Sequence, residues 1–281
     1  RCLIVEDRAA DAVALLEGHL ANDPDNPALH QAIAGAYQAE GDRAAALDHF
    51  ERAFAINPGD HFSARAAAAT ALSLAAAAGD DAIAESFNSR ALEIATRLAT
   101  AAPEYENALL AGEAALGARQ LEAAAAWFAA AMKSRPQEPL ARFYLGRTLA
   151  ALDHDDQAIT HLRAALGAAP DEELAVRIHS QLARLLACGL ELGEAARHYR
   201  AAGDGDRAAE IDALAGSFNE ALGRLADLRR DVAALAGMEA ELEALGDANG
   251  VAALAGRREA MGREIGAIEG NLAAVRSALC R

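Results

Sequence analysis

The sequence has few of the side chains from which β-sheets are built. Valine and isoleucine together account for 16 of the 281 residues, and aromatic residues for 4%. Because β-branched and aromatic side chains pack the pleated surface of strands, a sheet-based core is close to excluded. Alanine, in contrast, occurs 79 times. Alanine loses the least on entering a helix, so the composition predicts an all-α protein.

Positive charge is also scarce, since Lys133 is the only lysine and the net charge is −16. Nucleic acids and anionic membrane surfaces repel such a chain, so neither is expected as a partner. The longest apolar run, Ala64–Ala78, is interrupted by Arg65 and is too short to span a bilayer. The first residues show no signal-peptide pattern, and we therefore expect no membrane insertion.

Cysteine is the next rare residue. Cys2, Cys188 and Cys280 are odd in number, far apart and contain no C-x-x-C spacing. They predict neither a disulfide framework nor a zinc site. A reducing compartment fits this usage best, so we expect a cytoplasmic location and leave a periplasmic one open.

Proline is infrequent, but its spacing is regular. Between successive prolines one pattern recurs with steps of 4, 9, 4, 3 and 5 residues. Its three full copies are Ile33, Tyr37, Ala46, Phe50, Ala53 and Pro58; Ala111, Ala115, Ala124, Phe128, Ala131 and Pro136; and Leu145, Leu149, Ala158, Leu162, Ala165 and Pro170. A fourth copy lacks only the proline and consists of Leu182, Leu186, Ala195, Tyr199 and Ala202.

These steps predict pairs of helices. Spacings of 3 and 4 place side chains on one helix face, and the step of 9 crosses a turn into a second helix. Small residues such as Gly112 and Gly146 let the two helices approach, and large ones such as Phe128 fill the space beside them. The proline then ends the second helix of each pair.

The pattern resembles that of the tetratricopeptide-repeat family, whose repeat is 34 residues long. Residues 27–60, 105–138 and 139–172 match at full length, 176–209 match after a three-residue shift, and 8–26 resemble the second helix of an earlier repeat, with 1–7 as the end of its first helix. Residues 61–104 are about ten residues too long for one repeat, and we expect an elongated pair of helices, Ala64–Ala78 and Asp81–Ala101. The resemblance implies an α-solenoid over residues 1–210.

The last 70 residues follow a different pattern. Apolar residues recur at spacings of 3 and 4 on both sides of 246–250, a segment rich in Gly and Asn that is typical of a turn. Met238 lies out of register, and Arg258 interrupts the second series. Residues 211–281 therefore predict an antiparallel helical hairpin of coiled-coil type. It has three possible uses: self-association into a homo-oligomer, capping of the solenoid, or docking of a partner.

No motif indicates catalysis or a bound cofactor. The sequence lacks G-x-S-x-G, H-E-x-x-H, a P-loop and a dinucleotide-binding glycine pattern. The densest polar cluster surrounds His154 at a turn of the repeat, where a solvated loop is a better interpretation than a metal site. His179 and His198 are interpreted as packing or surface residues. We therefore expect no catalytic residues, no metal and no cofactor.

The resemblance implies a groove lined by the first helix of each pair. Arg and aromatic side chains often anchor interfaces, and the candidate partner-binding residues on these helices are Gln31, Gln38, Leu109, Glu113, Phe143, Tyr144, Arg147 and Arg184. Phe143 and Tyr144, beside Arg147 and Arg184, are the strongest candidates, although either ring could instead pack between repeats. The Lys, Asn and Arg residues with which family members hold chaperone C-termini are missing.

A binding role follows from these observations. We expect a non-catalytic scaffold or adaptor, of a type found in bacterial assemblies, that holds a segment of a partner protein in the groove. The arginines favour an acidic or C-terminal peptide segment. Two alternatives remain open, namely the regulatory or substrate-binding arm of a larger enzyme such as a transferase or hydroxylase, and an assembly factor that forms homo-oligomers through residues 211–281.

Overall fold

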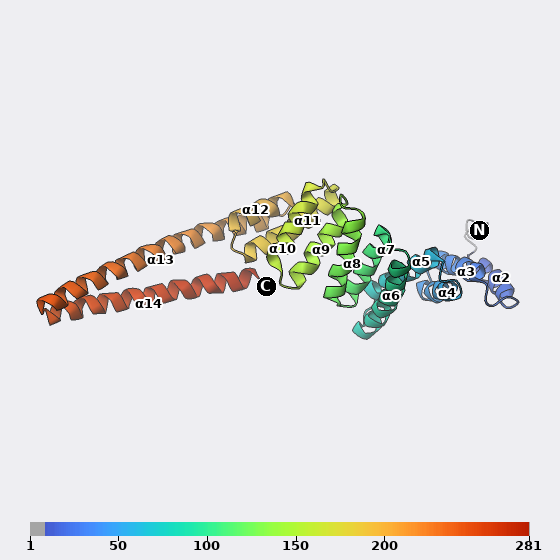
Figure 1. Cartoon of the computed structure of the whole chain (residues 1–281), viewed down its shortest axis with the longest axis horizontal. Coiled ribbons are helices and arrows are strands. Elements are labelled where there is room, and N and C mark those ends of the chain that lie inside the picture. Colours follow the sequence, from blue (N-terminus) through green and yellow to red (C-terminus); the bar gives the residue numbers. More distant parts are fainter. Residues whose placement is uncertain (1–8, 281) are drawn as a thin grey trace. The chain divides into compact units, whose positions relative to one another are not determined.

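The computed structural model describes residues 9–280, and these residues form helices joined by short turns without any strand (Figure 1). The all-α prediction is confirmed. The expectations for residues 1–7, including Cys2, lie outside the described residues. Internal contacts group the chain into two units, one up to Ala168 and one from Ala169 onward, and each unit is described by itself.

Unit 1 is a stack of helix pairs preceded by a single helix. Its helices are α2 (Ala9–Leu20), α3 (Pro27–Glu40), α4 (Arg43–Ile56), α5 (His61–Ala77), α6 (Asp81–Ala101), α7 (Tyr105–Gly117), α8 (Leu121–Ser134), α9 (Pro139–Ala151) and α10 (Asp155–Gly167). Within the unit, helices that follow each other in the sequence pack on each other. Helices α5 and α6 have 17 and 21 residues, where the other pairs of unit 1 have helices of 13 or 14, and α5 begins at His61 where a start at Ala64 was expected. The interpretation of residues 61–104 as one elongated repeat stays a prediction.

Local sequence explains where these helices begin. The side chain of Asn26 accepts hydrogen bonds from the backbone N–H groups of Ala28 and Leu29, and Asp42, Asp60 and Asp80 cap the next three helices in the same way. Such caps satisfy backbone donors that have no partner within the helix. Pro27 and Pro139 occupy the first turn of α3 and α9, where a missing N–H costs nothing.

Two glycines allow close packing inside the pairs. A Cβ atom on Gly112 would lie 2.5 Å from Phe128 Cε1, and one on Gly146 would lie 2.8 Å from Leu162 Cγ. Phe128 and Leu162 are fully buried. The predicted arrangement, in which a small residue faces a large one, is therefore confirmed in both repeats.

The turn inside four of the five described helix pairs contains one residue with a left-handed backbone, and the turn between α5 and α6 contains none. This position is Gly41 in the first full repeat, with φ of 87°. Arg119, Asp153 and Leu190 hold the same position in later repeats, with φ of 58°, 59° and 64°. Glycine adopts this conformation freely, whereas other residues do so at a cost, so three of the four turns are strained.

Unit 2 consists of one further pair followed by two long helices. Its helices are α11 (Glu172–Cys188), α12 (Leu192–Ala201), α13 (Gly205–Leu245) and α14 (Ala248–Leu279). The expected five-residue turn is shorter, because α14 starts at Ala248 with Asp247 as its cap and Gly246 ends α13 in a left-handed conformation. The expected boundary between residues 210 and 211 falls within α13 and stays a prediction.

Helices α13 and α14 pack on each other as a hairpin, with Leu225, Leu228 and Leu235 buried between them. Met238, which the pattern places out of register, is 51% exposed, and Glu239 takes the inward position. The carboxylate of Glu239 pairs with Arg258 at 3.0 Å. The two interruptions of the apolar pattern therefore face each other and compensate in charge. The other oxygen of Glu239, Oε1, is buried and without a hydrogen-bond partner in the described chain.

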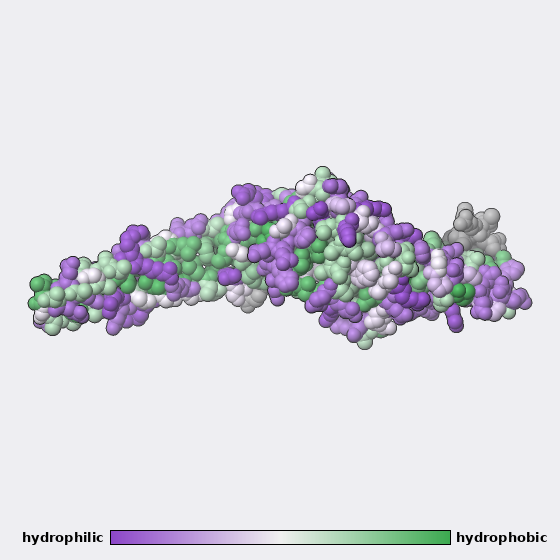
Figure 2. Space-filling view, viewed as in Figure 1, coloured by the Kyte–Doolittle hydropathy of each residue, from purple (hydrophilic) through white to green (hydrophobic). Residues whose placement is uncertain are grey.

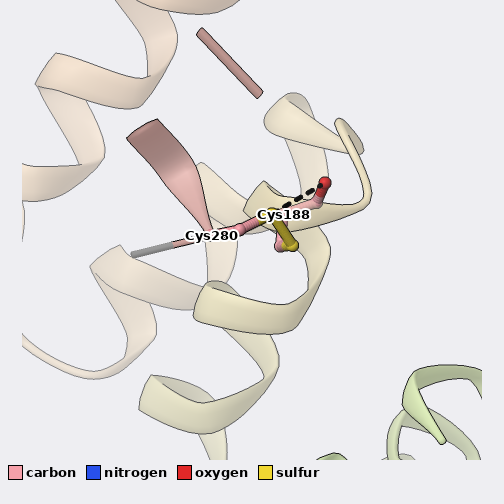
Figure 3. Close-up of a disulfide and its surroundings, with 2 residues drawn as sticks. All are labelled: Cys188 and Cys280. Atoms are coloured by element: carbon pink, nitrogen blue, oxygen red, sulfur yellow. Dashed lines mark hydrogen bonds between the residues drawn. A yellow bond between two sulfur atoms is a disulfide. The ribbon is translucent and has the colours of Figure 1, made fainter. Parts of the chain in front are cut away.

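A disulfide joins Cys188, at the end of α11, to Cys280, directly after α14 (Figure 3). The Cα atoms lie 4.7 Å apart, within the usual range for such a bond. The prediction that the cysteines form no disulfide is therefore wrong. Their separation of 92 residues hid the pairing, because only the return of α14 along α13 brings the two ends together.

Two histidine pairs occupy equivalent positions in different repeats. The Nδ1 atoms of His30 and His49 lie 2.9 Å apart, and those of His179 and His198 lie 2.7 Å apart. His30 Nε2 donates to the carbonyl oxygen of Pro24 at 3.1 Å, so its Nδ1 accepts a hydrogen bond from His49. Of the two interpretations of His179 and His198, packing or surface, their mutual contact and half-buried rings favour packing.

Candidate functional site

The first helices of the pairs in unit 1 share a surface that we call the inner face, formed by α3, α5, α7 and α9. Helix α5 contacts both its own partner and α7, so these two first helices are neighbours. The inner face contains seven of the eight sequence-predicted residues, and Arg184 lies exposed on α11 in unit 2. Nothing places Arg184 beside the other seven.

A shallow pocket of about 370 Å³ opens between α3 and α5. Its lining consists of Gln38, Arg43, Ala66, Ala69, Thr70 and Ser73. The small side chains of α5 create the depression, and the longer Gln38 and Arg43 form its rim. The pocket therefore combines room for a backbone with amide, hydroxyl and guanidinium groups that can donate hydrogen bonds.

The two glutamines of α3 reach across to α5. Gln38 Nε2 donates to Thr70 Oγ1 at 3.4 Å, and Gln31 Nε2 lies 3.5 Å from both Asp60 Oδ2 and Ser63 Oγ. These contacts are long, so they are weak and readily exchanged. An incoming polar backbone can therefore replace them at little cost.

Tyr144 and Arg147 form the second part of the inner face, on α9. The ring of Tyr144 stacks on Phe128, with centroids 5.1 Å apart and planes 10° from parallel. The guanidinium of Arg147 lies 5.7 and 5.8 Å from the ring centroids of Phe143 and Tyr144. Stacking and cation–π contact orient Arg147 before any partner arrives.

Phe143 departs from the prediction of an exposed aromatic anchor. It is 2% exposed, and its ring centroid lies 5.5 Å from that of Tyr144. Burial removes a large apolar ring from water, which outweighs any gain from leaving it free for a partner. Phe143 therefore supports Tyr144 and Arg147 and offers no contact area of its own.

Leu109 and Glu113 lie on α7 between these two parts. Both are half-buried, and Leu109 packs against a cluster that contains Tyr105 and Ala108. Burial raises the pKa of Tyr105, whose ring also faces the guanidinium of Arg135. The roles of Leu109 and Glu113 in binding stay predictions.

Arg43, on the rim of the pocket, and Arg147, on α9, differ from Arg65 and Arg90 in their surroundings. Neither forms an ion pair with a residue in the described part of the chain, whereas Arg65 lies 3.8 Å from Glu104 and Arg90 contacts both Asp48 and Glu51. Those two acidic partners raise the pKa of Arg90. Arg43 and Arg147 therefore keep their charge available for an acidic group from outside the described chain.

Sequence reasoning missed most of the pocket. Thr70 and Ser73 were not singled out, because α5 belongs to the elongated repeat, where the 34-residue pattern gives no register. Arg43, on α4, was not singled out either. Among residues 9–280 no group of three or more His, Cys, Asp or Glu side chains could hold a metal ion. Within the same residues, no helix is both long and apolar enough to cross a membrane.

Comparisons with known proteins identify the fold. No family model matches the chain, and no curated protein matches it. The crystal structure of MamA is similar with a TM-score of 0.53 and 15% identity, over 62% of this chain and 95% of MamA. YrrB is similar with a TM-score of 0.53 and 13% identity, over 72% of this chain and 97% of YrrB.

A third structure, TTC0263 from Thermus thermophilus, aligns at 23% identity with a TM-score of 0.45, over 68% of this chain and 98% of its own. YrrB and TTC0263 are both described as TPR proteins. On the similarity to YrrB, the chain has the tetratricopeptide-repeat fold, and the resemblance found in its repeats is confirmed at that level.

Proposed function

We propose that unit 1 binds an extended segment of a partner protein along the inner face and holds its carboxylate groups with Arg43 and Arg147. The protein then acts as a non-catalytic scaffold within a multiprotein assembly. The observation that carries this proposal is the pocket between α3 and α5, where Arg43 has no ion-pair partner among the described residues. An acidic side chain or a C-terminal carboxylate fits that chemistry.

The position of Arg43 supports a ligand of negative charge. Arg43 is the first residue of α4, where the positive end of the helix dipole disfavours a cation. A carboxylate bound there relieves this repulsion and accepts charge-assisted hydrogen bonds, which are about twice as strong as neutral ones. Ser73 and Gln38 provide further donors in the same pocket.

The inner face has room for a backbone beside these groups. Ala66 and Ala69 line the pocket, and a Cβ on Gly35 of α3 would meet nothing within 4 Å. YrrB, which shares this fold, is described as having an unusual peptide-binding site. Both observations favour an extended segment, because its backbone can approach small residues closely.

Synthetic peptide pools test the proposal on the full-length chain. We expect immobilised protein to retain random ten-residue peptides that carry Asp, Glu or a free C-terminus in preference to amidated pools without acidic residues. For a retained peptide, fluorescence anisotropy is expected to show a Kd about tenfold higher for Arg43→Ala, since a hydrogen bond to a charged group contributes about 1.5–3 kcal/mol.

Arg52→Ala is the matched control, because Arg52 is exposed on the same helix and lies outside the pocket. It is expected to leave the Kd unchanged. Retention of no peptide from any pool would remove the proposed function. Equal affinity of the wild type and Arg43→Ala would leave groove binding in place but remove Arg43 as its anchor.

Two further expectations remain proposals. Self-association through the hairpin would use its exposed apolar residues Leu222, Met238 and Leu245, and Figure 2 shows hydrophobic surface along α13 and α14.

The Cys188–Cys280 bond favours an oxidising compartment, such as a periplasm, over the cytoplasm that the cysteine count indicated.

A further inference from the structure

The hairpin of unit 2 has weak packing along its returning helix. None of the 32 residues of α14 is buried, and its apolar residues near the end, Leu272, Val275 and Leu279, are only half-buried. Helix α14 packs on α13 along its length and touches α11 only over a small area. Most of the hydrophobic stabilisation that holds a helix in a larger core is therefore missing here.

The residues of α14 weaken it further. A Cβ atom on Gly256, Gly262, Gly266 or Gly270 would meet no other atom within 4 Å, so close packing does not require these glycines. Glycine inside a helix lowers its stability relative to alanine. The buried Oε1 of Glu239 also lacks a hydrogen-bond partner in the described chain, which adds a desolvation penalty within the hairpin.

A covalent bond at the end of α14 compensates for the weak packing of this helix. The disulfide ties Cys280 to Cys188 on α11, and Sγ of Cys280 lies 3.7 Å from the carbonyl oxygen of Cys188 (Figure 3). Cys280 is exposed and Cys188 is half-buried. A thiolate from solution can therefore reach the bond without prior unfolding.

We propose that the Cys188–Cys280 bond is a redox-sensitive latch that keeps the hairpin closed at its base. A dithiol reductant cleaves the bond when one of its thiolates attacks a sulfur and its second thiol resolves the mixed disulfide. Two electrons pass from the reductant, which becomes a disulfide, and Cys188 and Cys280 each end as a thiol. Without the bond, the last turns of α14 separate from α13 and α11.

The open form differs from the closed form in the surface that it presents. Leu272, Val275 and Leu279, which are half-buried at the end of α14 in the closed form, become exposed. Oxidation reverses the change and buries this surface again. The hairpin is therefore completed only after the chain meets an oxidant, which couples its final shape to the redox state of the compartment.

Hydrogen exchange followed by mass spectrometry tests the latch on the full chain. Cys2→Ser serves as the background, so that the third thiol cannot exchange with the bond. We expect amides in residues 268–279 to exchange roughly tenfold faster in dithiothreitol than in the oxidised protein, because local opening sets their exchange. Amides of α7 and α8, which belong to unit 1, are the internal reference and should not change.

A variant that also carries Cys188→Ser and Cys280→Ser is the matched control. It should exchange rapidly at residues 268–279 whether or not dithiothreitol is present. Equal protection of these residues in the oxidised and reduced protein would overturn the proposal, because non-covalent packing would then suffice. Peptide mapping that finds Cys188 and Cys280 as free thiols after air oxidation would overturn it as well.

Discussion

Gly112 shows how much of the repeat depends on one missing methyl group. Because its Cβ would lie 2.5 Å from the buried ring of Phe128, Gly112→Ala forces the two helices of the pair apart. Overpacking of this kind destabilises by about 1–3 kcal/mol. We expect that loss in the free energy of unfolding by urea, followed by the fluorescence of Trp127, the only tryptophan.

Gly35→Ala is the control for this change, since its Cβ would meet no atom within 4 Å. Gly35 lies inside α3, where alanine favours the helix by up to about 1 kcal/mol. The control should therefore keep or raise stability. If both substitutions had the same effect, helix propensity alone would explain them and the close approach at Gly112 would not matter.

Glu239 and Arg258 give a second prediction at this scale. Arg258→Leu leaves the carboxylate of Glu239, which is 10% exposed, without its cation. We expect a loss of about 1–3 kcal/mol, the cost of an unsatisfied buried polar group. The double variant with Glu239→Leu and Arg258→Leu should recover this loss, because an apolar pair of similar size avoids the desolvation penalty.

Thermal unfolding followed by circular dichroism measures these changes, and the oligomeric state is checked by light scattering. A charged pair in a coiled-coil seam fixes register at a cost in stability. The double variant is therefore expected to be more stable than Arg258→Leu, and the register between α13 and α14 is expected to be less specific. A double variant no more stable than Arg258→Leu alone would contradict the compensation between the two residues.

Single residues were the hardest features to derive from sequence. The apolar spacing located the hairpin and left Met238 out of register, but it did not indicate that the charged Glu239 takes the inward position. Only the facing position of Arg258 makes a buried carboxylate tolerable there. Phe143 follows the alternative that the sequence left open, a buried ring, because a helix-face pattern does not show which neighbouring side chains cover a ring.

At the scale of elements, the two histidine pairs make helix pairing sensitive to pH. Burial lowers the pKa of His49 and of His179, and the charge of nearby His30 lowers that of His49 further. Around His49, Glu17 and Asp48 raise the pKa and Arg52 lowers it. The net shift is downward, so the folded protein holds these histidines neutral at a pH where the unfolded chain already binds protons.

The sign of the effect follows from proton linkage. Stability from the histidine pairs is fully present above the unfolded pKa of about 6.5 and is lost as the pH falls through the lower folded values. We expect the urea midpoint to fall between about pH 7.5 and pH 5.5 for this reason. Replacing His49 and His179 by Gln should remove most of the difference.

His19→Gln is the control, because His19 is exposed at the end of α2 and makes no such pair. It should leave the pH dependence as in the wild type. A midpoint that does not change with pH in the wild type would show that the paired imidazoles accept protons without opening the repeats.

Elements were the part that sequence predicted best. The recurring steps of 4, 9, 4, 3 and 5 encode contacts between helices that follow each other directly in the chain, so they fix the pairs locally. The limits of α6 agree with the predicted Asp81–Ala101, whereas α5 begins at His61, three residues before the predicted Ala64. The turn before α14 was placed too widely, because Asn249 and Gly250 continue the helix once Asp247 caps it.

At the scale of the whole molecule, the sequence predicted a groove that binds a partner segment. It named only some of the residues that line the pocket between α3 and α5. Gln38, which lines the pocket, is among the residues predicted from the repeat register, whereas Arg43, the first residue of α4, occupies a position to which the pattern assigns no residue type. The disulfide was not predicted either, because its two cysteines lie in segments that are far apart in the sequence. Contacts between distant segments depend on how far each helix runs, and helix ends are the least determined part of a pattern.

The continuity of α13 has a mechanical consequence. This helix packs on α12 at its start and carries the hairpin tip at its far end. With 41 residues at about 1.5 Å each it is roughly 60 Å long. A tilt of roughly 10° where it meets α12 would swing the tip by about 10 Å. Small adjustments in the final repeat are thereby amplified at the tip, as in a lever.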